Sequence, residues 1–132
     1  MGSRVKVKIR DYQRSRVYRL DDAVKALYDS TPISLEECRA LVKQAFHGRK
    51  GCPVVTDGRG RCRPCGSILR IRLPRASRLP HMVLHECAHG MATDRHGPQF
   101  VARYMELLVR HLGLEFGGLV KLADEIGVDV QQ

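Results

Sequence analysis

The sequence contains no tryptophan and few other aromatic residues. Three phenylalanines and four tyrosines make up 5% of its 132 residues. Proteins that bind single-stranded nucleic acid by stacking its bases usually rely on several aromatic side chains. The composition therefore gives little support to that binding mode.

Long apolar runs are also missing. Residues 1–10, MGSRVKVKIR, carry positive charges but no apolar segment of the length found in signal peptides. No later stretch is apolar over the roughly 20 residues that a helix needs to cross a bilayer. We therefore expect a cytoplasmic protein with no membrane partner.

Acidic residues are outnumbered by basic ones. Twenty-three Lys and Arg against 14 Asp and Glu give a formal net charge of +9, and the basic residues concentrate at 4–19 and 49–78. Such a surface raises the rate of encounter with polyanions such as nucleic acid or acidic proteins. A solvated basic surface that only aids solubility explains the same numbers, so nucleic acid is one partner to test.

The overall composition is that of a globular protein. Hydrophobic residues make up 43% and charged residues 28% of the chain, which argues against wholesale disorder. A length of 132 residues suits one core that needs no disulfides. We expect residues 1–132 to form a single domain.

Helical and extended patterns divide the chain. Apolar residues recur every three or four positions in five segments: 11–28, 35–46, 80–92, 98–112 and 114–126. Residues 51–74 have an extended pattern around the turn sequence TDGRG, which predicts two or three antiparallel strands. The expected class is α+β, with N-terminal helices, a small and mainly antiparallel sheet, and C-terminal helices.

One helical segment carries a metal-binding pattern. HECAHGMATDRHGPQF, residues 85–100, opens with two histidines four residues apart. On a helix, His85 and His89 lie on one face and can direct a nitrogen each to one point, as zinc requires. Glu86 is rotated about 100° from His85 and can accept a proton from a metal-bound water. The alternative is an exposed histidine pair on a helix that packs through its other side.

A third ligand must come from outside this helical turn. We favour His96, which follows the expected chain reversal at TDRHG and precedes the next helix. Asp94 and Glu106 are the alternatives. Three protein ligands leave one position of a tetrahedral zinc ion open to water, which is typical of a catalytic site.

The cysteines suggest a second metal site. Five is an odd number, and in a reducing compartment cysteines are core residues or metal ligands more often than disulfides. Cys38 lies on an apolar helix face and is expected to be buried. Cys52, Cys62 and Cys65, with His47 as a fourth ligand, could hold a structural zinc ion. Unligated thiols, or a disulfide between Cys52 and Cys65, are the alternatives.

Several motifs resemble those of known metallopeptidases. HECAH followed by HGPQF is similar to the SprT-like and related minimal zincins. Together with DYQRSRVY and LADEIGVDV, these motifs resemble a family of small zincin metallohydrolases of actinobacteria and their phages. The resemblance covers about residues 10–130 and is poorest in the basic middle segment. It implies a minimal zincin-like fold in which His85, His89 and His96 bind Zn²⁺ and Glu86 is the base.

These residues predict zinc-dependent hydrolysis of peptide bonds in a protein or peptide substrate. Zinc would lower the pKa of a bound water and polarise the substrate carbonyl, and Glu86 would pass the water's proton to the leaving amine. The extended segment SILRIRL could offer an edge to the substrate backbone. Tyr104, His111 and Arg95 are candidates for stabilising the oxyanion.

Two other functions fit the same residues. The basic stretches 4–19 and 59–78 suggest an enzyme that cleaves DNA-bound proteins, as SprT-like proteases do. They also suit a non-catalytic binding module, in which zinc is architectural and the basic surface contacts DNA or a protein partner.

Overall fold

The computed structural model describes residues 11–28, 31–58, 65–66 and 70–132, with only the backbone described for 65–66. In chain order its elements are α1 (Arg14–Leu27), α2 (Leu35–Ala45), β1 (Val54–Thr56), β2 (Cys65–Gly66), β3 (Arg70–Arg72), the 3-10 helix η1 (Arg75–Ser77), α3 (Pro80–His89), α4 (Pro98–Leu112) and α5 (Phe116–Ile126). The α+β class is confirmed.

Local sequence signals set the ends of the helices. The amide of Glu37 donates to the Ser34 hydroxyl, and the amide of Ser34 donates to the Glu37 carboxylate, both at 3.1 Å. This capping box starts α2 and satisfies backbone donors that a helix start leaves unpaired. Gly113 and Gly127 end α4 and α5 with φ angles of 69° and 84°, which glycine adopts without steric cost.

The sheet differs from the prediction. β1 pairs with β3 in parallel, β2 pairs with β3 antiparallel, and the strand order is β1-β3-β2. The expectation of a mainly antiparallel sheet is therefore wrong for the β1–β3 pair. β2, the next described strand after β1, does not form a hairpin with it. Instead β3 lies between β1 and β2 and pairs with both. Ile71 in this central strand is fully buried.

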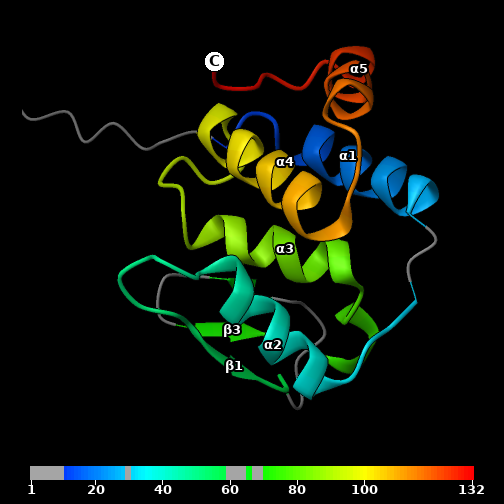
Figure 1. The fold of residues 1–132 in the computed structure, drawn as a ribbon. Coiled ribbons are helices and arrows are strands. Elements are labelled where there is room, and N and C mark those ends of the chain that lie inside the picture. Colours follow the sequence, from blue (N-terminus) through cyan, green and yellow to red (C-terminus); the bar gives the residue numbers. More distant parts are fainter. Residues whose placement is uncertain (1–10, 29–30, 59–64, 67–69) are drawn as a thin grey trace, which may run out of the picture.

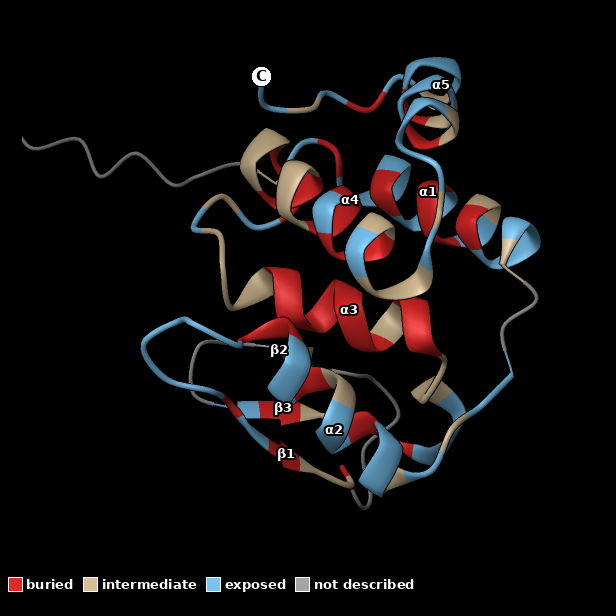
Figure 2. Cartoon of the chain, viewed as in Figure 1, coloured by how far each residue is buried: buried red, intermediate tan, exposed pale blue. Residues whose placement is uncertain are grey.

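Helix α3 lies at the centre of the molecule. In Figure 1 it runs between the sheet with α2 on one side and α1 with α4 on the other. Figure 2 shows it buried over most of its surface, and eight of its ten residues are buried. Three of these eight, His81, His85 and Glu86, are polar or charged. Buried groups of this kind need partners, because an unpaired one is costly.

The core is apolar and joins the five described α-helices. Its largest fully buried side chains include Leu20, Ile71, Leu84 and Phe100. Cys38 is also fully buried, as expected from its place on an apolar helix face. None of the helices in the described ranges combines the length and the apolar character that crossing a bilayer requires.

Candidate metal centre

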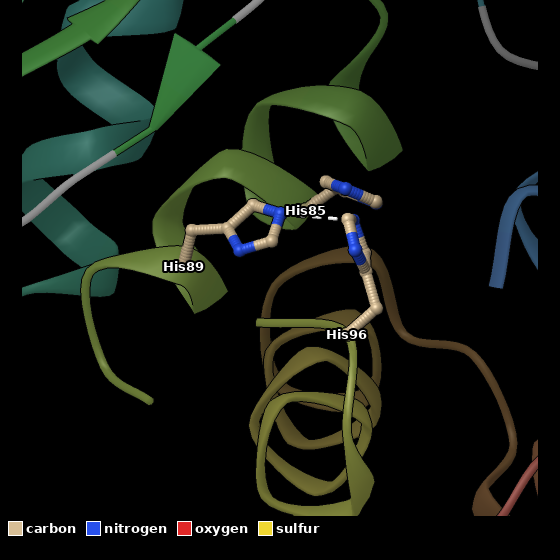
Figure 3. Close-up of side chains that lie close together, drawn as sticks. All are labelled: His85, His89 and His96. Atoms are coloured by element: carbon tan, nitrogen blue, oxygen red, sulfur yellow. Dashed lines mark hydrogen bonds between the residues drawn. The ribbon is translucent and has the colours of Figure 1, made fainter. Parts of the chain in front are cut away.

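Three histidines from two segments meet beside α3. His85 and His89 lie one turn apart on α3, and His96 lies in the loop that precedes α4. One ring nitrogen from each lies within 4.8 Å of the others, and Figure 3 shows the three imidazoles gathered around a common space. This cluster could bind a metal ion.

The closest pair of ring nitrogens has the spacing of two zinc ligands. His89 Nε2 and His96 Nε2 are 3.2 Å apart. Two nitrogens at about 2.05 Å from a tetrahedral zinc ion lie about 3.3 Å apart. His89 and His96 could therefore ligate one ion with little movement.

Two carboxylates fix the ring orientations. His85 Nδ1 donates to Asp21 Oδ1 at 3.0 Å, and His96 Nδ1 donates to Asp11 Oδ2 at 2.9 Å. Asp11 Oδ1 also accepts from the backbone amide of His96 at 3.1 Å. A proton held on Nδ1 leaves the lone pair on Nε2, which is the tautomer that binds a metal through Nε2.

The roles of these two carboxylates were not predicted from the sequence. One signal was present: Asp21 occupies a position on the apolar face of α1, between Leu20 and Val24, and is itself buried. A charged residue on a buried face needs a partner. Nothing in the sequence indicated that this partner is His85, which lies 64 residues away.

The alternative ligands are engaged elsewhere. Asp94 accepts from the backbone amides of Gln99 at 2.7 Å and Phe100 at 3.0 Å, and so caps the start of α4. Glu106 is exposed and forms an ion pair with Arg103 at 3.2 Å. Among the described residues, His96 joins His85 and His89, and Asp94 and Glu106 do not.

Glu86 is buried beside the cluster. Its Oε2 lies 4.0 Å from His85 Nε2, and 4% of the residue is exposed. Burial, together with the negative charge of Asp21, raises the pKa of Glu86 to about 7, although His85 opposes the shift. A carboxyl with this pKa can both accept and release a proton near neutral pH.

The histidines differ in protonation. Burial and the two neighbouring histidines lower the pKa of His89 to about 3, so this ring is neutral and one of its two nitrogens carries a lone pair. Burial would also lower the pKa of His85, but the charge and hydrogen bond of Asp21, with the charge of Glu86, raise it overall. Burial lowers the pKa of His96 despite the opposing effect of Asp11.

Aromatic rings form the inner wall of the cluster. The Phe100 ring centroid lies 4.9, 4.4 and 5.2 Å from those of His85, His89 and His96. The Tyr104 centroid lies 5.4 Å from that of His85. Phe100 and Tyr104 are both fully buried. They exclude water from the inner side of the cluster.

The other predicted site residues are not part of this cluster or lie outside the described residues. Arg95 is exposed in the loop before His96, and His111 is in the last turn of α4. Cys52 is an exposed free thiol ahead of β1. Cys62 and the side chain of Cys65 lie outside the described residues, so the second zinc site stays a prediction.

Comparisons with known proteins provide no relative of this chain. No family model matches it, and neither a curated protein nor a solved structure does. The resemblance to zincins therefore rests on short motifs such as HECAH and HGPQF.

Proposed function

We propose that this protein is a zinc-dependent metallopeptidase of the minimal zincin type, acting on a protein or peptide substrate. The observation that carries the proposal is the convergence of three imidazoles next to a buried carboxylate. Nitrogens of His85, His89 and His96 lie within 4.8 Å of one another, and Glu86 Oε2 lies 4.0 Å from His85 Nε2. Three histidine ligands leave one position of a tetrahedral zinc ion open.

Each residue has a distinct role in this proposal. His85, His89 and His96 would hold Zn²⁺, which when bound lowers the pKa of water and polarises a carbonyl group. Glu86 Oε2 accepts the proton of the attacking water and gives it to the leaving amine. Asp21 and Asp11 act through hydrogen bonds that hold the rings of His85 and His96.

The test is a comparison of Glu86→Gln with the zinc-loaded wild-type protein. General acid–base catalysis typically contributes about 10²–10⁴-fold, so Glu86→Gln should lower kcat for peptide cleavage by at least about 100-fold. Elemental analysis should find the same zinc content as in the wild-type protein, because Glu86 is not a ligand. Glu106→Gln, at an exposed position on α4, is the control and should keep full activity.

Two outcomes contradict the proposal. Full proteolysis by Glu86→Gln would show that Glu86 is not the base. An absence of cleavage by the zinc-loaded wild-type protein, across a diverse peptide library, would favour a binding module with an architectural metal instead.

A further inference from the structure

Tyr18, on α1, forms an outer wall of the histidine cluster. Its ring centroid lies 5.4 Å from that of His96 and 6.4 Å from that of His85. Unlike Phe100 and Tyr104, which are fully buried, Tyr18 is 43% exposed. A ligand that approaches the cluster from solvent can therefore meet the Tyr18 side chain.

The hydroxyl of Tyr18 is held by an arginine one turn earlier. Arg14 Nε donates to Tyr18 Oη at 3.1 Å, and the guanidinium carbon lies 5.6 Å from the ring centroid. A phenol oxygen can accept one hydrogen bond and donate another at the same time. Because the oxygen accepts from a cation here, its O–H group is polarised and becomes a better donor.

We infer that the Tyr18 O–H group donates a hydrogen bond to the ligand oxygen bound at the metal, which in the proposed peptidase is the carbonyl oxygen of the scissile bond. The inference rests on the proposed function. Donors that are already in place where negative charge develops are among the strongest contributors to catalysis. Tyr104 is fully buried and its ring packs against that of His85, whereas Tyr18 on α1 is open to solvent. Arg14 is a positioning residue, because it acts through Tyr18.

The chain offers a matched control for this residue. Tyr12 precedes α1 and is 48% exposed, close to the 43% of Tyr18. Its hydroxyl donates to Asp129 Oδ2 at 3.0 Å. Tyr12→Phe therefore removes a similarly exposed hydroxyl whose partner is Asp129, in the C-terminal segment.

The experiment measures ligand binding without turnover. The wild-type protein, Tyr18→Phe and Tyr12→Phe are loaded with cobalt(II) and titrated with acetohydroxamate, a small metal ligand with a charged oxygen, by visible absorption. Losing one hydrogen bond to a charged group costs about 1.5–3 kcal/mol, so Tyr18→Phe should raise the Kd at least about tenfold. Tyr12→Phe should stay within twofold, and the cobalt affinity of both variants should be unchanged. Arg14→Gln should give an intermediate increase in the Kd.

Three results would overturn the inference. These are acetohydroxamate binding by Tyr18→Phe equal to that of the wild-type protein, equal weakening by Tyr12→Phe, and no binding by the cobalt-loaded wild-type protein. Peptide cleavage is scored separately, and there Tyr18→Phe should lower kcat about tenfold with KM within twofold. If hydroxamate binding depends on Tyr18 but no peptide is cleaved, the proposed peptidase function fails and the role of Tyr18 stands.

Discussion

Burial of the Glu86 carboxyl lowers the free energy of unfolding when this group is ionised. Its pKa is raised from an ordinary value of 4.5 to about 7 by burial. The folded protein therefore keeps this proton to a higher pH than the unfolded chain does. The free energy of unfolding of the metal-free protein falls as pH rises from about 4.5 to about 7, and this loss persists at higher pH.

Replacing Glu86 should recover this free energy. Each unit of pKa shift corresponds to about 1.4 kcal/mol. We expect Glu86→Gln to stabilise the metal-free protein by about 3 kcal/mol at pH 8 and by less than about 1 kcal/mol at pH 5. Urea denaturation with a chelator at both pH values measures this difference. Glu106→Gln removes only an ion pair with Arg103 and should have the same small effect at both pH values. An equal effect of Glu86→Gln at both pH values would contradict the prediction.

His89 has the opposite pH dependence. Its pKa is lowered from 6.5 to about 3 by burial and by the nearby histidines. The unfolded chain binds the proton more readily, so stability is lost as pH falls from about 6.5 towards about 3. The measurement on Glu86 therefore stops at pH 5, above most of this loss.

The residues of the candidate site differ in how far the sequence could predict them. The placement of His85, Glu86 and His89 is a local property, since it depends only on the helical repeat. His96 follows from a chain reversal a few residues later. Asp21 and Tyr18 could not be assigned, because their contacts depend on how α1 packs against α3.

At the scale of elements, the loop between α3 and α4 brings His96 to the cluster. Asp94 holds this loop by accepting from the amides of Gln99 and Phe100 in the first turn of α4. Gly97 packs so closely against the Asp94 side chain that a Cβ atom at position 97 would lie 2.5 Å from Asp94 Oδ2. Arg95 adopts a left-handed φ of 59°, which is uncommon for a residue other than glycine. The loop therefore has a defined shape.

Asp94→Ala should loosen the loop without removing a ligand. The loss of a capping side chain costs about 1–2 kcal/mol, which urea denaturation measures. Competition with a chromophoric chelator should show metal affinity reduced several-fold, because His96 is held less firmly. Asp124→Ala, at an exposed position on α5, should change neither quantity. A complete loss of metal from Asp94→Ala would show instead that Asp94 is a ligand.

The secondary structure elements were predicted unequally well. Helices of 10 to 15 residues contain several turns of apolar periodicity and distinct end signals, so the sequence located all five. The described strands are two or three residues long. Such short segments carry too little periodicity to choose a partner or a direction, and the parallel β1–β3 pair was missed for this reason.

At the scale of the whole molecule, the N-terminal helix region completes a site built mainly from residues 85–96. Asp11 and Asp21 contribute to it from positions 85 and 64 residues away from their histidine partners. The start of α1 is held in turn by the fully buried Gln13. Its side-chain nitrogen Nε2 donates to the backbone carbonyl of Asp129 at 3.1 Å, and its side-chain oxygen Oε1 accepts from the backbone amide of Asp129 at 2.9 Å. Metal binding and the docking of α1 should therefore be coupled.

Asp21→Asn tests this coupling. Loss of a carboxylate that holds a metal-ligating histidine typically lowers metal affinity about 10–100-fold, and we expect a reduction of this size by chelator competition. The rise in Tm on adding zinc should shrink accordingly, since the stabilisation by a bound ligand grows with the logarithm of its affinity. Asp22→Asn, at the exposed neighbouring position, is the control and should bind zinc normally. Equal affinities for the two variants would show that α1 is uncoupled from the site.

The placement of the tyrosines has an optical consequence. The chain has four tyrosines and no tryptophan, so its ultraviolet fluorescence comes from tyrosine. Two of the four, Tyr18 and Tyr104, contact the ring of His85. A paramagnetic ion such as copper(II) held by the imidazoles would quench these nearby emitters, so occupancy could be followed by intrinsic emission without an added dye.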